Sequence, residues 1–154
     1  MSTAAALAAA KFARKVGAEL VGVFVVPELR YPIYIEATPP TYLTTEEYRS
    51  SMQTVGDTFL NEIKKAAASD DVPFTGRVVF FDSVLSGIVA TAEENGCDMI
   101  FIGSRGQNEW HRMLLGSVTS KVLVLSSLPV LVFRSPKEEG RPLDADEARQ
   151  ENKT

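Results

Sequence analysis

Two clusters rich in glycine and hydroxyl residues have the composition needed to bind a charged ligand. The first is Gly103-Ser104-Arg105-Gly106, and the second, Gly116-Ser117-Val118-Thr119, begins after nine intervening residues. Glycine lets a backbone approach a ligand closely. The first turn of a helix offers unpaired N–H groups at the positive end of the helix dipole. If a helix begins at Ser117, this segment is suited to holding phosphate oxygens.

The spacing differs from that of two common phosphate-binding patterns, the Walker A loop and the short Gly-x-Gly-x-x-Gly dinucleotide turn. The alternative is that the glycines only shape a turn between a strand and a helix. Arg105 and Arg112 either neutralise phosphate charge or are solvated loop cations. Lys121 is better explained as a surface lysine than as a ligand-binding residue.

The surrounding residues predict the elements that would position this segment. An alanine-rich helix over 2–16 ends at Gly17, and residues 27–44, which hold four of the eight prolines, are predicted to form a loop. Apolar runs predict buried strands at 20–26, 78–81, 99–102 and 130–133, and helices are predicted over 45–68, 84–95 and 117–126. This alternation predicts a three-layer α/β/α open parallel sheet, which binds ligands at the carboxyl ends of its strands.

Composition limits the classes of function. The chain has 154 residues, 45% of them hydrophobic, and a net charge of -4, which disfavours nucleic-acid binding. No apolar run is long enough for a membrane span. One cysteine suits a reducing compartment, so we expect a cytoplasmic protein. Residues 135–154 contain ten charged residues and are expected to form a disordered tail after a domain over 1–134.

Single reactive residues give little support for catalysis. His111 and Cys97 are the only histidine and cysteine, so a metal centre or a nucleophile–histidine pair has no obvious partners. We expect His111 in a surface loop rather than steering phosphate, and Cys97 as a small buried residue rather than a redox sensor. Trp110 is expected to pack the loop down, with a dimer contact as the alternative. The adjacent pair Glu46-Glu47 is interpreted as helix capping rather than as an acid–base pair.

The segment Gly103-x2-Gly106-x9-Gly116-Ser117 resembles the nucleotide-binding motif of the universal stress protein family, Gly-x2-Gly-x9-Gly-Ser/Thr. Cys97–Gly106 resembles the family's fourth strand and its exit, and Ser127–Arg134 resembles its fifth strand. The likeness covers roughly residues 2–134. It implies a Rossmann-like fold with strand order 3-2-1-4-5.

The resemblance also implies roles for individual residues. The expected ligand is ATP, with or without Mg²⁺. The residues implied at the phosphates are Gly106, Gly116, Ser117, Val118 and Thr119, with Gly103 near the ribose and Val26 and Ile102 near the adenine. Arg105 joins the candidate nucleotide-binding residues because its charge could neutralise phosphate. Family members commonly pair through their last strands, which implies a homodimer seam at Val130, Leu131, Val132 and Phe133.

The chain departs from the family pattern at its beginning. The family's first, central strand ends in Asp-Gly-Ser and supplies an aspartate to the adenine, and no residue here matches it. Either the chain starts downstream of the natural start, which we favour, or it is a truncated relative. Ile33-Tyr34-Ile35 is too short and too close to Pro32 to be expected to fill the gap. A smaller departure places Phe81 and Ser83 where the family often has glycine and proline.

Three functions follow as hypotheses. The first is a nucleotide-binding regulatory module of the stress response, with a protein partner still to be identified. The second is an enzyme, such as an ATPase or a kinase-like protein. Glu109 is the only carboxylate between Gly103 and Ser126, which is too few for efficient magnesium-assisted phosphoryl transfer, so we expect slow hydrolysis at most. The third is an interaction protein of the same fold that binds no nucleotide.

Overall fold

The computed structural model describes residues 3–29, 33–35, 41–104 and 115–134. The elements follow in the order α1 (Thr3–Val16), β1 (Leu20–Pro27), β2 (Ile33–Ile35), β3 (Thr41–Leu43), α2 (Thr45–Ser69), β4 (Phe74–Phe81), α3 (Val84–Glu94), β5 (Ile100–Gly103), α4 (Ser117–Leu125) and β6 (Val130–Phe133). The predicted tail lies outside the described residues.

Helix ends follow from local chemistry. Gly17 (φ 67°) closes α1 and Gly96 (φ 62°) follows α3, both in the left-handed region that glycine adopts without a Cβ penalty. Thr44 and Glu47 form a capping box at the start of α2, and the Ser83 side chain caps α3 by accepting from the Ser86 N–H. The predicted helix ends are therefore confirmed within one or two residues.

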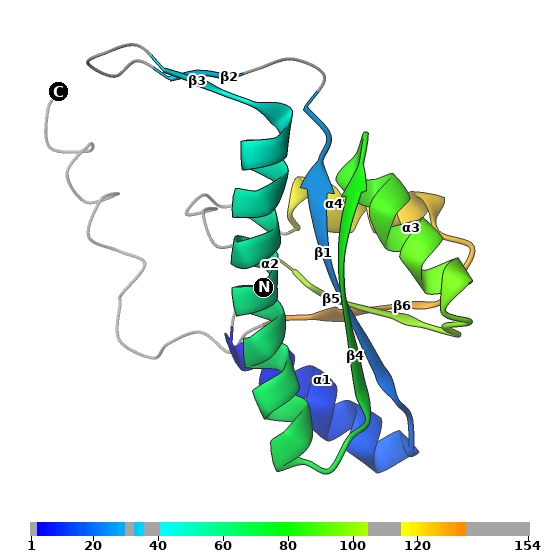
Figure 1. The fold of residues 1–154 in the computed structure, drawn as a ribbon. Coiled ribbons are helices and arrows are strands. Elements are labelled where there is room, and N and C mark those ends of the chain that lie inside the picture. The colour runs from blue at the N-terminus through cyan, green and yellow to red at the C-terminus, as the bar shows by residue number, and fades with distance from the viewer. Residues whose placement is uncertain (1–2, 30–32, 36–40, 105–114, 135–154) are drawn as a thin grey trace, which may run out of the picture.

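The strands form three separate pairs. β1 and β4 are parallel over their full lengths, with Leu20 opposite Phe74 and Pro27 opposite Phe81. β5 and β6 are parallel, with Ile100 opposite Val130. The short strands β2 and β3 form an antiparallel pair. The predicted parallel α/β architecture is confirmed, and Figure 1 shows α1 and α2 on one side of the β1–β4 pair, with α3 and α4 on the other.

Side chains of β1 alternate between the two helical layers. Phe24 stacks on Phe59 of α2 with ring centroids 5.4 Å apart. Val25 lies against Gly87 of α3, which has no Cβ and so lets that helix approach the strand closely. The core is completed by a cluster of Ala92, Ile100 and Val122 on the α3–α4 side. This burial on both faces explains why the sequence of β1 is a continuous apolar run.

Two expectations are wrong in detail. Residues 27–44 were expected to form only a loop, but Ile33–Ile35 and Thr41–Leu43 pair as strands, because short runs of β-formers can pair even in a proline-rich segment. The strand expected at 78–81 begins at Phe74. Thr75, Gly76 and Arg77 are exposed and not uniformly apolar, yet the backbone of β1 pairs with them.

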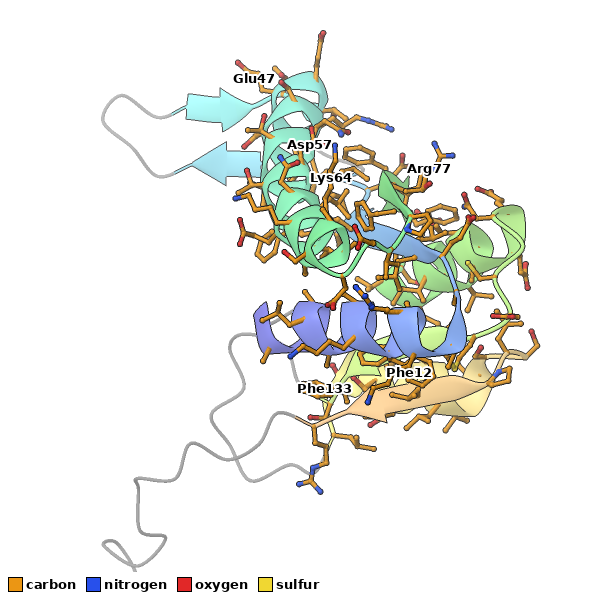
Figure 2. The ribbon with its side chains drawn as sticks, turned by 90° about the horizontal axis from the view of Figure 1, so that it is seen from below. Phe12, Glu47, Asp57, Lys64, Arg77 and Phe133 are labelled. Carbon is orange, nitrogen blue, oxygen red and sulfur yellow. The ribbon has the colours of Figure 1, made fainter. Side chains whose placement is uncertain are left out.

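The central strand expected to be missing is indeed missing among the described residues. Among the strands that the structure describes, β1 pairs with β4 and β5 pairs with β6, so the two parallel pairs do not join. Helix α1 reaches across the gap, and its Phe12 ring lies 6.2 Å from the ring of Phe101 in β5. In Figure 2, Phe12 projects from α1 on the side of β6, where Phe133 lies. None of the described helices combines the length and apolarity that crossing a bilayer requires.

Candidate nucleotide-binding site

The amino end of α4 lies where strand β5 leads into the glycine segment. Gly116 is the N-cap residue, with extended backbone angles (φ -69°, ψ 156°), and as a glycine it makes no side-chain cap. No acidic residue stands in the first turn. Among the residues that the structure describes, the first-turn N–H groups therefore have neither an intrahelical nor a side-chain acceptor. This end of α4 is suited to an anion.

Hydrogen bonds hold this helix end against the end of β5. The Gly116 N–H donates to the Ser104 carbonyl at 2.8 Å, and the Thr119 hydroxyl donates to the Gly103 carbonyl at 2.8 Å. Ser104 and Thr119 are both buried. Sequence reasoning treated Thr119 as a hydroxyl donor to a ligand. In the structure its proton is directed to Gly103, so Thr119 positions the helix.

The predicted site residues differ in their exposure. Ser117 is exposed, Val118 and Ile102 are half-buried, and Gly116 is buried. Val26 is only 1% exposed and is therefore enclosed by protein already. Arg105, Gly106, Trp110, His111 and Arg112 lie outside the described residues, so the predictions for them stay predictions.

A cavity of about 570 Å³ lies beside the site and occupies the gap between β1 and β5. Ile102, Gly103, Val118 and Thr119 line one end of it. Ala18 and Glu19, which precede β1, line it together with Asn95–Asp98, which precede β5. The cavity thus runs from the amino ends of both strands to the carboxyl end where the glycine segment begins.

Comparison with known proteins identifies the family. Residues 1–134 match the model of the universal stress protein family. The chain belongs to this family. Its curated relatives include universal stress protein YxiE of Bacillus subtilis (strain 168), which is 34% identical over 89 residues, or 58% of this chain and 60% of YxiE. The aligned region thus spans less than two thirds of that relative's length.

Solved structures of universal stress proteins share the fold. UspA from Lactobacillus plantarum has a TM-score of 0.68 at 22% identity and covers 85% of this chain and 88% of its own. A universal stress protein in complex with cAMP has a TM-score of 0.60 at 20% identity, covering 88% of each chain. One from Archaeoglobus fulgidus in complex with dAMP has a TM-score of 0.56 at 18% identity, covering 84% of this chain and 85% of its own.

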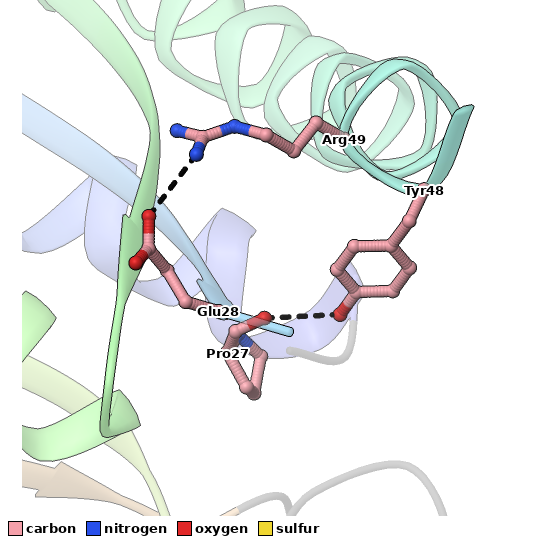
Figure 3. A network of polar contacts seen from close by, with 4 residues as sticks. All are labelled: Pro27, Glu28, Tyr48 and Arg49. Atoms are coloured by element: carbon pink, nitrogen blue, oxygen red, sulfur yellow. Dashed lines mark hydrogen bonds and ion pairs between the residues drawn. The ribbon is translucent and has the colours of Figure 1, made fainter. Parts of the chain in front are cut away.

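In this member of the family, a polar network ties the first turn of α2 to the carboxyl end of β1 (Figure 3). The Tyr48 hydroxyl donates to the Pro27 carbonyl at 3.1 Å, and Arg49 contacts the Glu28 carboxylate at 3.1 Å. The Arg49 guanidinium also lies 4.3 Å from the centroid of the Phe80 ring. Sequence reasoning missed this network, because its partners lie on separate elements and carry no local signal.

The metal-ligating and nucleophilic side chains of the described residues are dispersed. No group of three or more His, Cys, Asp or Glu side chains that could hold a metal is found there. Cys97 is half-buried rather than buried, and its burial, with a smaller contribution from Asp98, raises the pKa of its thiol. A raised pKa keeps the thiol protonated and makes it a poor nucleophile at neutral pH. Lys121 is exposed, as predicted.

Proposed function

We propose that this universal stress protein binds an adenine nucleotide, ATP in particular, and acts as a regulatory module rather than as an efficient enzyme. The observation that carries this proposal is the amino end of α4, which has no cap from the described side chains and which Gly116 and Thr119 anchor to the carboxyl end of β5. Such a helix end stabilises negative charge through oriented N–H groups. It can do so locally even though the chain has a net charge of -4.

The proposed site divides the ligand between two regions. The phosphates would lie on the N–H groups of Ser117, Val118 and Thr119, and Arg105 and Gly106 remain predicted phosphate contacts from the sequence. The ribose would lie near Gly103. The adenine would contact Ile102, which is half-buried, more directly than Val26, which is enclosed.

The relatives with bound nucleotides support the ligand class. The complexes with cAMP and dAMP each contain an adenine, a sugar and a phosphate, and ATP presents the same three parts. The choice of ATP over these ligands rests on the resemblance of the Gly103–Ser117 segment to the glycine motif of ATP-binding family members. Magnesium would accompany ATP through its phosphates, since the described residues offer no metal cluster of their own.

The test is an equilibrium titration of the full chain with Mg–ATP, AMP and cAMP, repeated on Gly116→Asp. An aspartate at this N-cap would accept from the first-turn N–H groups and repel a phosphate. Two like charges about 4 Å apart at an effective dielectric constant near 20 repel by ~4 kcal/mol. Each 1.4 kcal/mol corresponds to a factor of ten, so we expect affinity to fall by at least about a hundredfold.

Two matched variants serve as controls. Gly116→Ala adds bulk without charge and separates crowding from repulsion. Ser83→Asp places the same charge at the N-cap of α3, where a side chain already caps the helix, and should leave ATP affinity unchanged. The proposal is wrong if the folded chain binds no adenine nucleotide, or if Gly116→Asp binds ATP as tightly as the parent.

We also propose that two copies pair through β6, the strand implied by the family resemblance. β6 has β5 on one edge and no other described strand neighbour. The Ile100 N–H donates to Pro129 and the Ser104 N–H to Phe133, so odd-numbered residues of β6 bond to β5. The main-chain groups of Val130 and Val132 therefore point to the free edge.

The test of this pairing is Val132→Pro, which removes one N–H from the free edge of β6. The substitution should shift a dimer toward monomer in sedimentation. An unchanged dimer would contradict pairing through β6.

A further inference from the structure

A second cavity, of about 460 Å³, lies between β4 and the last turns of α3. Phe81 of β4 lies against Gly87 of α3, where an added Cβ would be 3.3 Å from the ring. Side chains of a strand alternate between its two faces, so those of Arg77 and Val79 face α3 as well. None of the lining residues belongs to the proposed nucleotide site. They are Arg77, Val78, Val79, Thr91, Glu94 and Asn95.

The open edge of β4 borders this cavity. The Leu20 N–H donates to the Pro73 carbonyl and the Glu28 N–H to the Phe81 carbonyl, so odd-numbered residues on this side direct their main-chain groups to β1. The N–H and C=O groups of Val78 therefore point to the opposite edge, where no described strand pairs with β4. Val78 thus offers one main-chain donor and one acceptor beside the cavity.

Two opposite charges line the cavity without neutralising each other. Arg77 and Glu94 are both exposed, and neither makes an ion pair with another described residue. Helix α3 ends at Glu94 and has no basic residue in its last turn, so the partial negative charge of the helix end adds to that of the carboxylate. The cavity therefore presents a cation from β4 and a negative region from α3.

One polar group in the cavity wall is buried without a partner. Thr91 is 3% exposed, and its hydroxyl makes no hydrogen bond with any described residue. Thr91 lies between this cavity and the larger one beside β1, and its main-chain carbonyl already accepts from the Asn95 side chain at 2.8 Å. Buried hydroxyl groups normally have a partner, so this one indicates a place for a polar ligand.

We propose that this cavity binds a free α-amino acid with a small aliphatic side chain. The ligand carboxylate is matched by the Arg77 guanidinium and the Val78 N–H, and the ligand ammonium by the Glu94 carboxylate and the Val78 C=O. The Thr91 hydroxyl can donate to the first group or accept from the second. Val79, which is half-buried, supplies apolar contact for the aliphatic side chain. A simple anion would leave Glu94 unmatched, and a simple cation would leave Arg77 unmatched.

The test is a titration of the full chain with L-valine, L-valinamide and N-acetyl-L-valine, followed by NMR. Valinamide keeps the ammonium group and lacks the carboxylate, whereas N-acetylvaline keeps the carboxylate and lacks the ammonium group. Each analogue should bind at least about tenfold more weakly than valine, a factor equivalent to ~1.4 kcal/mol. The proposal is overturned if valine does not bind, or if either analogue binds as tightly as valine.

Variants of the protein assign each ligand charge to its partner. Arg77→Gln should bind valine at least about tenfold more weakly and should no longer distinguish valine from valinamide. Glu94→Gln should likewise no longer distinguish valine from N-acetylvaline. Lys64→Gln and Glu93→Gln make the same charge changes at exposed residues that do not line the cavity, and both should bind valine as the parent does. Unchanged selectivity in Arg77→Gln or Glu94→Gln would contradict the assignment.

Thr91→Val separates a role in binding from a role in the fold. It replaces an unpartnered hydroxyl by a methyl group, so the variant should be at least as stable as the parent in urea unfolding without ligand. It should bind valine several-fold more weakly, and an unchanged affinity would contradict the role of Thr91. Gly116→Asp, which alters the proposed nucleotide site, should bind valine normally, so failure of one proposal can be distinguished from failure of the other.

Discussion

The closeness of α3 to β1 makes the substitution Gly87→Ala informative. An alanine Cβ would lie 2.4 Å and 2.9 Å from the two methyl carbons of Val25 and 3.3 Å from the ring of Phe81. Carbon atoms in favourable contact lie roughly 3.5–4.0 Å apart, so the helix and the strand must separate by about 1 Å. Overpacking of this kind costs roughly 1–3 kcal/mol.

Helix propensity acts in the opposite direction at this position. Alanine is favoured over glycine inside a helix by ~1 kcal/mol, so Gly87→Ala should destabilise the fold by about 1 kcal/mol net. That corresponds to a fall in Tm of about 4 °C for a domain of this size. Urea unfolding followed by circular dichroism measures the change, provided that the m-value stays constant.

The double variant isolates the contact. Val25→Ala alone removes two methyl groups from a half-buried side chain, at a cost of roughly 1 kcal/mol. In the double variant, the methyl group that Gly87→Ala adds occupies part of the space that Val25→Ala vacates. The stability losses of the two single variants should therefore add up to at least ~1 kcal/mol more than the stability loss of the double variant. A Gly87→Ala protein that is more stable than the parent would refute the close approach of α3 to β1.

Two further predictions concern helix ends. Gly17→Ala should lower the free energy of unfolding by roughly 1–2 kcal/mol in chemical denaturation, because Gly17 has φ 67°, which strains any residue with a Cβ. The added Cβ meets no atom within 4 Å, so backbone strain is the only cost expected. An unchanged stability would show that the turn can adopt another conformation. The hydrogen bonds from Thr44 lower the pKa of Glu47, so its contribution to stability is present above its ordinary pKa of 4.5 and is lost as the pH falls through the lower folded value. The stability difference between the parent and Glu47→Gln should therefore be largest near pH 7 and shrink in acid, and a difference independent of pH would contradict this assignment.

The elements with strong local signals could be predicted from the sequence. The helix beginning at Thr45 has a capping box within four residues, and Gly17 stops the first helix by its own conformational freedom. The strand beginning at Phe74 could not be bounded, because Thr75, Gly76 and Arg77 are exposed and their extended form is set by pairing with β1. Local patterning does not report pairing between segments so far apart in the chain.

The candidate site shows the same division. The open helix end could be predicted, because Gly116 has no side chain with which to cap α4. The direction of the Thr119 hydroxyl could not be predicted, because it depends on the Gly103 carbonyl sixteen residues earlier in the chain. The contacts of Tyr48 and Arg49 with the end of β1 likewise depend on how α2 packs on the sheet.

The row of rings from α1 to the last strand has a consequence for how the domain unfolds. Phe12 lies 6.2 Å from Phe101, and Phe101 lies 6.1 Å from Phe133, measured between ring centroids. Because no described backbone ladder joins the two parallel strand pairs, side-chain packing of this kind carries their cooperativity. We therefore expect the β5–β6 half to open as a separate foldon, at a free energy lower than that of global unfolding. A strand between the pairs would merge the two halves into one melting unit.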